Sequence, residues 1–416
     1  MILVPPPLRL FQGLGLEWEY MIVDAQTGSV MPIADRVLQA PSGEYRSGAD
    51  EGEMGWSNEL ALHVIELKTK GPVAALDGVG EAVSGDIERI NLKLQPAGAC
   101  LMPSGMHPWM DPRQETRLWP HEYNPVYQAF NRIFDCRGHG WSNLQSLHLN
   151  LPFAGDDEFG RLHAAIRLVL PLLPALAASS PFQDGQFTGC LDNRLENYRL
   201  NCARIPSITG RVIPEAVFTE AEYRRQILER IYRDIAPYDP DQELQDEWLN
   251  ARGAIARFDR GTIEIRLLDV QENPFADLAV AAAVLEVLRG LVYGRWAGWE
   301  AQQSMTAAAL ESILLETIRQ GEAALVTDPE FLRIFNLSPE NPWRAGDLWR
   351  HLLAQTVLNE DATRDPWRAP LQVILDQGCL ARRLLRAAGT NPSRDCLRAV
   401  YRELCRCLAG GAMFQP

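Results

Sequence analysis

Strands in which polar and apolar side chains alternate constrain the fold of this chain more than any other sequence feature. Successive side chains of a β-strand point to opposite faces of a sheet, so the pattern has a period of two. In residues 13–24, Glu17 and Glu19 share one face, and the other face carries Leu16, Trp18, Tyr20 and Ile22. Residues 144–150 and 262–269 alternate in the same way. The pattern predicts strands with one polar and one apolar face.

The polar faces of these strands carry carboxylates and one imidazole. His148 lies between Ser146 and Asn150, and Glu264 shares a face with Arg266. Carboxylates that share a buried face repel one another and lose hydration unless a cation compensates them. A site for Mg²⁺ or Mn²⁺ explains such a face, because both ions accept oxygen ligands and an imidazole. The alternative is a polar face that is simply exposed to solvent.

A further apolar run, residues 58–69, contains Glu59 and Glu66 and is expected to form a strand. These two glutamates are seven residues apart, so a regular strand would place them on opposite faces. Their side chains converge only if the strand contains a bulge or a bend. We keep both glutamates as candidate metal ligands.

Two arginines are candidates for binding an anionic group. Arg266 places a guanidinium two residues after Glu264, which suits a phosphoryl group held beside a metal. The alternative is an ion pair within the strand. Arg194 lies in residues 177–199, which are expected to form an irregular loop that approaches a ligand closely; an exposed loop arginine is the alternative. His107 is expected to belong to a structural turn.

Helices are expected to follow the last alternating strand. Asn273 and Pro274 have the sequence of a helix N-cap and a first helical position, so residues 277–292 are predicted to be helical. Residues 161–179 and 220–235 are also expected to form helices. Short strands in the first half and helices from about residue 275 onward indicate the α+β class.

The length of the chain allows one large domain with insertions. We expect a catalytic domain over residues 1–295 and a helical C-terminal extension over residues 296–416 that packs on it. One continuous domain is the alternative.

Composition excludes several classes of function. The net charge of −14 argues against a nucleic-acid partner. The apolar stretches near residues 164–178 and 278–292 contain charged residues and do not predict a membrane span. Lysine occurs only at positions 68, 70 and 93, and no P-loop motif is present. The eight cysteines lack zinc-binding spacing. We therefore expect a cytoplasmic protein with reduced thiols.

Six segments resemble, in order and spacing, the motif series of the glutamate-cysteine ligase type 2 and carboxylate-amine ligase family. They cover roughly residues 13–292 and read GLGLEWEY, NELALHVIELKT, SGMHPW, QSLHLN, ASSPFQDGQFTG and TIEIRLLDV. Each motif is weak alone, but their shared order is hard to obtain by chance.

The resemblance implies a fold similar to that of glutamine synthetase. Such a fold has a curved antiparallel sheet with helices on its outer face, and its concave face holds ATP and divalent metals. By this resemblance Glu17 and Glu19 face two different ions, and Glu59 and Glu66 surround one of them.

The remaining matched residues would hold the metal nearest the ATP phosphates. His148 and Glu264 match ligands that share this ion with Glu17, and Arg266 matches the arginine beside the transferring phosphoryl group. The family usually has a His-x-His pair where this chain has Ser146 and His148. The missing imidazole implies a difference in metal affinity or in substrate choice.

The resemblance implies an ATP- and Mg²⁺-dependent ligase that joins glutamate, or a related acid, to an amine such as cysteine through an acyl phosphate. Two alternatives stay open: a metal-dependent amide hydrolase, which needs no nucleotide, and a non-catalytic relative that binds a nucleotide or metabolite. The expected partners are small molecules, and a homo-oligomer is possible.

Overall fold

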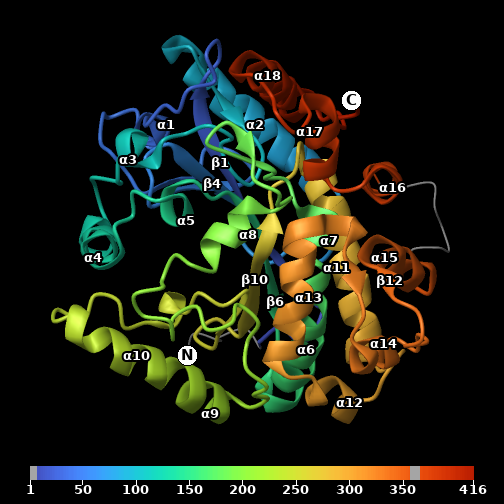
Figure 1. Ribbon diagram of the computed structural model, residues 1–416. Coiled ribbons are helices and arrows are strands. Elements are labelled where there is room, and N and C mark those ends of the chain that lie inside the picture. The colour runs from blue at the N-terminus through green and yellow to red at the C-terminus, as the bar shows by residue number, and fades with distance from the viewer. Residues whose placement is uncertain (1–6, 357–365) are drawn as a thin grey trace.

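The computed structural model describes residues 7–356 and 366–416 (Figure 1). A central antiparallel sheet has the strand order β2-β3-β4-β1-β6-β10-β9, and β5 also pairs with β1. Its strands are β1 (Gly15–Asp24), β2 (Gly48–Ala49), β3 (Gly55–Asn58), β4 (Val64–Lys68), β5 (Ala99–Met102), β6 (Ser146–Pro152), β9 (Ala254–Arg257) and β10 (Thr262–Asp269). The predicted α+β class with an antiparallel sheet is confirmed.

Ten helices precede β9 in the described part of the chain, besides short 3₁₀ and π turns. They are α1 (Ala34–Leu38), α2 (Val79–Leu94), α3 (Pro112–Glu115), α4 (Asn124–Phe134), α5 (His139–Ser142), α6 (Gly155–Val169), α7 (Pro174–Ala177), α8 (Asn193–Tyr198), α9 (Glu220–Tyr223) and α10 (Glu229–Ile235). The helices after β10 are α11 (Pro274–Val292), α12 (Trp299–Ser304), α13 (Ala307–Gln320), α14 (Pro329–Ile334), α15 (Ala345–Ala354), α16 (Arg368–Gln377), α17 (Leu380–Ala388) and α18 (Arg394–Gly410).

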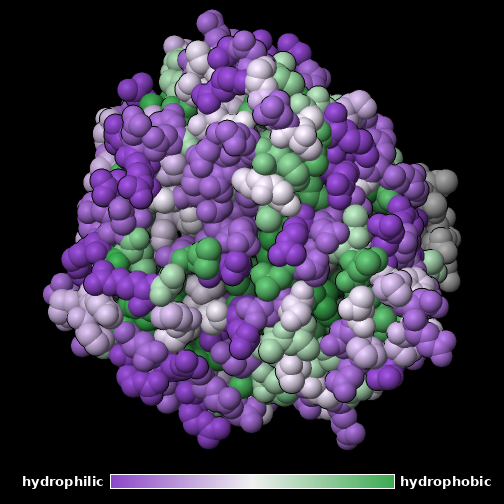
Figure 2. Space-filling view, viewed as in Figure 1, coloured by the Kyte–Doolittle hydropathy of each residue, from purple (hydrophilic) through white to green (hydrophobic). Residues whose placement is uncertain are grey.

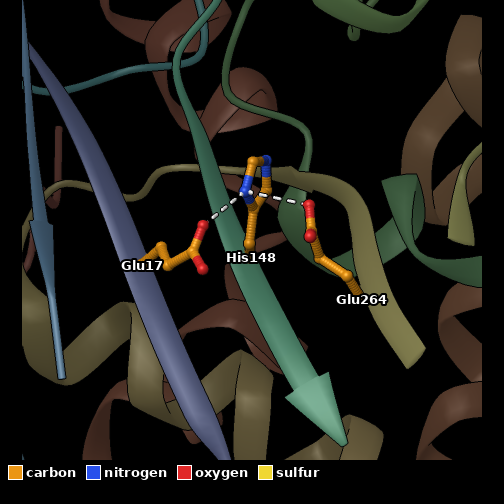
Figure 3. Close-up of side chains that lie close together, drawn as sticks. All are labelled: Glu17, His148 and Glu264. Atoms are coloured by element: carbon orange, nitrogen blue, oxygen red, sulfur yellow. Dashed lines mark hydrogen bonds and ion pairs between the residues drawn. The ribbon is translucent and has the colours of Figure 1, made fainter. Parts of the chain in front are cut away.

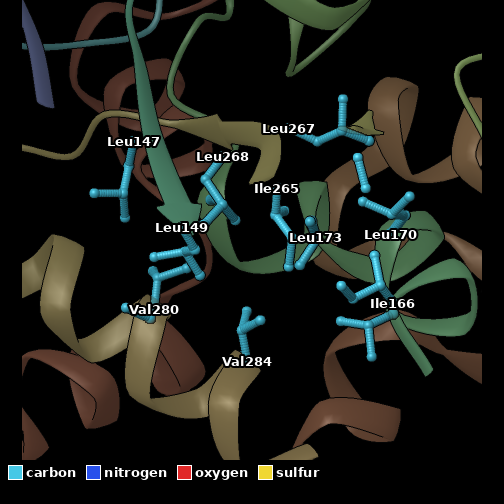
Figure 4. Packing of buried hydrophobic residues seen from close by; sticks show 14 of the residues in the cluster. Leu147, Leu149, Ile166, Leu170, Leu173, Ile265, Leu267, Leu268, Val280 and Val284 are labelled. Carbon is cyan, nitrogen blue, oxygen red and sulfur yellow. The ribbon is translucent and has the colours of Figure 1, made fainter. Parts of the chain in front are cut away.

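Helices cover the apolar face of the sheet. Leu147 and Leu149 of β6 and Ile265 of β10 belong to one core with Val280 and Val284 of α11 (Figure 4). Helix α11 is buried along almost its whole length, so it is apolar all round rather than on one stripe. The same core includes Leu310 of α13 and Trp349 of α15, so helices after residue 296 share it.

Helices α17 and α18 lie near α2 at another edge of the molecule (Figure 1). Leu384 and Leu397 of these helices form a second core with Met21 of β1 and Met102 of β5. Arg383 of α17 is fully buried and pairs with the buried Glu272, at a distance of 3.3 Å between Nη2 and Oε2. This ion pair ties the end of β10 to the C-terminal helices.

Several boundaries differ from the sequence expectation. The expected strand over residues 58–69 is wrong, because β3 ends at Asn58 and β4 begins at Val64. The expected helix over residues 161–179 begins earlier as α6 and breaks into short turns at its prolines. The N-cap prediction is confirmed, because the Asn273 side chain accepts hydrogen bonds from the Phe275 and Ala276 amides.

Among residues 7–356 and 366–416, no helix is long and apolar enough to cross a bilayer. Hydrophilic residues dominate the face seen in Figure 2, and hydrophobic residues show between them in small groups.

His107 occupies a buried turn, as expected, and both of its ring nitrogens contact backbone groups. Its Nε2 lies 2.8 Å from the Gly28 carbonyl oxygen, and its Nδ1 accepts from the Trp109 amide at 3.3 Å. This pattern requires a neutral ring. Burial lowers the pKa of His107 from 6.5 to about 3, although the Gly28 contact opposes the shift.

The His107 pKa predicts a loss of stability in acid. Between pH 6.5 and 3 the unfolded state binds the proton more readily, so the contribution of His107 is full above pH 6.5 and decreases as the pH falls. The loss at pH 5 is about 2 kcal/mol. Urea unfolding of His107→Gln should therefore show a shallower pH dependence than that of the wild type between pH 7 and pH 5. A wild-type slope in His107→Gln would contradict the assignment.

The Arg383–Glu272 pair predicts a large stability effect. Arg383→Met keeps the length of the side chain but leaves the Glu272 carboxylate buried without its cation, so the free energy of unfolding should fall by about 3–5 kcal/mol. The neighbouring Arg382 pairs with Glu322 in a partly exposed position. Arg382→Met should cost about 0–1 kcal/mol, and equal losses in the two variants would contradict this account.

Candidate active site

Three strands bring Glu17, His148 and Glu264 together on the polar face of the sheet (Figure 3). Glu17 of β1 lies directly opposite His148 of β6, and Glu264 of β10 lies opposite Asn150 of β6. Directly opposite residues of an antiparallel pair point to the same face. The His148 Nδ1 atom lies 3.1 Å from Glu17 Oε2 and 3.6 Å from Glu264 Oε1. One ligand atom from each residue lies within 4.8 Å of the others.

The charges of Glu17 and His148 stabilise each other. Burial opposes ionisation of Glu17, but the hydrogen bond and charge of His148 outweigh it and lower the pKa of Glu17 to about 2. Burial likewise opposes protonation of His148, but the hydrogen bond to Glu17 and the charge of Glu19 raise its pKa. A proton on His148 therefore compensates the carboxylates when no other cation is bound.

Glu19 is hydrogen-bonded to the start of β6. The Ser146 amide and hydroxyl both donate to Glu19 Oε2, at 2.7 and 2.8 Å. The Ser146 hydroxyl also lies 2.9 Å from His148 Nε2. Ser146, which replaces the first histidine of the family pattern, thus connects Glu19 to His148.

Glu59 and Glu66 lie on the β4 side of β1, away from β6. Glu66 of β4 is opposite Glu19, and its Oε2 accepts from Lys68 Nζ at 2.8 Å and from the Ser57 hydroxyl. Glu59 lies in the connection between β3 and β4, where burial, followed by the charges of Glu19 and Glu66, raises its pKa. The turn between β3 and β4 brings the charge of Glu59 close enough to Glu66 for the two to interact. No bulge within a single strand is needed.

Arg266 lies at an irregularity of β10. The register with β6 shifts between Ile265 and Leu268, which is a β-bulge. The Arg266 Nε atom lies 2.8 Å from Glu264 Oε1, and nearby carboxylates, Glu264 foremost, raise the pKa of Arg266 against the opposing effect of burial. After the bulge, Asp269 pairs with Ser146, so its carboxylate points to the polar face.

Arg194 lies in α8, so the expected irregular loop is wrong at this residue. Its side chain is buried, so the alternative of an exposed arginine is wrong too. Its Nη2 donates to the Arg266 carbonyl oxygen at 2.7 Å, and its Nη1 lies 3.3 Å from Asp269 Oδ1. Asp269 also accepts from the Ser179 amide at 2.8 Å and from the Ser180 hydroxyl at 2.8 Å. Asp269 therefore orients Arg194 behind Arg266.

A cavity of about 560 Å³ covers this face of the sheet, a size suited to a small molecule. Its polar lining includes Glu19, Glu59, His148, Arg194 and Arg266. The rest of its lining is largely apolar and aromatic and includes Val126, Tyr127, Phe130, Trp141 and Trp248. The cavity thus combines charged groups with aromatic side chains.

The cluster of Glu17, His148 and Glu264 suits a hard divalent cation. Two carboxylate oxygens and one imidazole nitrogen converge from Glu17, Glu264 and His148, and such donors fit Mg²⁺ or Mn²⁺ better than a thiolate-binding metal. Glu19, Glu59 and Glu66 do not join this group of converging ligand atoms.

The sequence analysis did not assign site roles to Ser57, Lys68 or Asp269. The period of two along a strand places Ser57 and Lys68 beside the carboxylates only when the pairing of β3, β4 and β1 is known. Asp269 has the wrong parity relative to Glu264 for a regular strand, so only the bulge brings it to the polar face.

The model of the family described as Glutamate-cysteine ligase family 2 matches residues 13–403 of this chain. An uncharacterised protein of Archaeoglobus fulgidus is 36% identical over 276 residues, which span 66% of this chain and 74% of that protein. A protein of Clavibacter sepedonicus, which carries the provisional name glutamate–cysteine ligase 2, is 25% identical over 350 residues, or 80% of this chain and 82% of that one.

Solved structures share the fold. The glutamate–cysteine ligase of Francisella tularensis, solved in complex with AMP, has a TM-score of 0.58 at 12% identity and covers 97% of this chain and 90% of its own. A bifunctional glutathione synthetase from Pasteurella multocida has a TM-score of 0.52 at 16% identity, over 95% of this chain and 52% of its own. At these identities the similarity establishes the fold alone.

Proposed function

Because the chain belongs to glutamate-cysteine ligase family 2, we propose that it is an ATP-dependent ligase that joins the carboxylate of glutamate, or of a related acid, to an amine such as cysteine. The observation that carries this proposal is the convergence of Glu17, His148 and Glu264 beside Arg266. His148 and Arg266 of this group also line the cavity. The AMP complex of the Francisella tularensis ligase supports a nucleotide in the same kind of fold.

Glu17, His148 and Glu264 would hold a Mg²⁺ or Mn²⁺ ion on this face. When bound, this ion would neutralise charge on phosphate oxygens during phosphoryl transfer. Glu19, Glu59 and Glu66 are the candidates for a second ion by the family pattern.

The protein groups of this site act by position and charge. Arg266 lines the cavity with a guanidinium that can bind two phosphate oxygens at once. Arg194 also lines the cavity, and its bonds to Asp269 and to the Arg266 backbone hold both arginines in place.

The proposed reaction has two steps. A carboxylate oxygen of the acid attacks the γ-phosphorus of ATP and ADP leaves, which gives an acyl phosphate. The amine then attacks the acyl carbon, phosphate leaves, and the amine loses a proton as the amide forms.

We further propose that its partners are small molecules and that it works in the cytoplasm. The acidic composition and the small-molecule size of the cavity support this part of the proposal.

The direct test is ATP turnover with Mg²⁺ and glutamate, with and without a panel of amines that includes cysteine. Amine-dependent release of ADP and phosphate, with a matching amide product, would support the ligase. Amide hydrolysis without nucleotide would favour the hydrolase alternative. Nucleotide binding without turnover would favour a non-catalytic relative.

Glu264→Ala should abolish turnover while the protein stays folded. The substitution removes a proposed ion ligand and no apolar core side chain, and losing the ligand should lower kcat by about 100-fold or more. Thermal unfolding checks the fold, and Mn²⁺ binding checks the ion site. Wild-type turnover in this variant would contradict the assignment of Glu264.

Arg266→Lys should impair turnover although the charge is kept. A lysine cannot make a bidentate contact, and the loss of one charged hydrogen bond predicts a decrease in kcat of roughly 10-fold to 100-fold. The matched control is Arg257→Lys on the neighbouring β9, because Arg257 does not line the cavity. Equal turnover in the two variants would remove the phosphate role of Arg266.

A further inference from the structure

Lys68 lies within the row of carboxylates on the polar face. It is directly opposite Glu17 in the pairing of β4 with β1, so the two side chains share a face. Its Nζ atom lies 2.8 Å from Glu66 Oε2. The ammonium thus stands on the β4 side of Glu17, and His148 stands on the β6 side.

The Glu66 carboxylate is already engaged by protein donors. One oxygen, Oε2, accepts from both Lys68 and the Ser57 hydroxyl, and Ser57 is the residue opposite Glu66 on β3. A divalent ion that used this oxygen would have to displace Lys68 or lie beside its positive charge. The family pattern expects an ion here, at a carboxylate of which one oxygen is taken by two protein donors and lies against an ammonium.

Lysine is rare in this chain, so the presence of Lys68 among the carboxylates is unusual. Three of the 40 basic residues are lysines. Lys70 pairs with Asp50, whose side chain is 83% exposed. Lys93 pairs with Glu51, whose side chain is 38% exposed. Lys68 alone of the three contacts a carboxylate of the proposed active site. An ammonium is a compact point charge, whereas a guanidinium is planar. An ammonium therefore fits more readily into a position that would suit a metal ion.

We propose that Lys68 takes the place of a second divalent ion on this face, so that the protein binds one divalent ion, at Glu17, His148 and Glu264, and carries a fixed ammonium at Glu66. This inference rests on the proposed function, because it concerns the same site. It makes Lys68 a positioning residue that acts through Glu66 and Glu17.

The test is the number of Mn²⁺ ions bound by the full-length, chelator-treated protein without nucleotide. Calorimetric titration with MnCl₂, together with electron paramagnetic resonance of free Mn²⁺, gives this number. We expect one ion for the wild type and for Lys68→Arg, and two for Lys68→Met. Lys70→Met is the matched control, since it removes an ammonium from the same segment outside the carboxylate row, and it should bind one ion.

Each result decides the matter. Two ions in the wild type, or one ion in a folded Lys68→Met, would overturn the role of Lys68. Lys68→Gln serves as a second neutral variant, and circular dichroism checks the folding of each. The metal site of the proposed function is tested separately by Glu264→Ala, which should lose the single ion. No ion in the wild type would overturn both the Lys68 role and this metal site, whereas two ions would overturn the Lys68 role alone.

Discussion

Neutralisation of carboxylates that share one face of the central sheet is the constraint on which the site depends. Glu17, Glu19, Glu66 and Glu264 lie on neighbouring strands whose register makes their side chains neighbours. Like charges at this spacing destabilise a partly buried face unless cations lie between them. The protein supplies His148 between Glu17 and Glu264, Arg266 beside Glu264, and Lys68 beside Glu66.

The apolar face of the same strands holds this arrangement rigid. Leu147 and Leu149 alternate with Ser146 and His148 along β6, and they pack in the core with α11. A slip of one residue in the pairing would turn His148 into the apolar core and turn the leucines onto the polar face. The hydrophobic core therefore fixes which carboxylate lies opposite the imidazole, and helices distant in sequence contribute to the site through packing alone.

The sequence predicted the parts of the site that lie on one regular strand. The period of two placed Glu17 with Glu19 and His148 with Ser146, and the structure has these pairs on the polar face. It did not predict the turn that carries Glu59, because an apolar run through a tight connection looks like one strand. It also did not predict the burial of Arg194, because a short helix behind glycines has little local signal. Contacts such as Lys68 with Glu17 depend on strand pairing, which no local pattern encodes.

Ser146 departs from the family pattern, and the bulge in β10 departs from a regular strand. Both departures shape the site. A regular β10 would turn Asp269 toward the core, but the bulge places it opposite Ser146, where it orients Arg194. Ser146 in turn holds Glu19 with two hydrogen bonds, so Glu19 is directed toward β6 rather than toward Glu66. Ser146 thus donates hydrogen bonds to the Glu19 carboxylate but supplies no imidazole as a metal ligand. At Glu66, Ser57 and Lys68 likewise donate to one oxygen, and this contact is the basis of the proposal that the face binds a single ion.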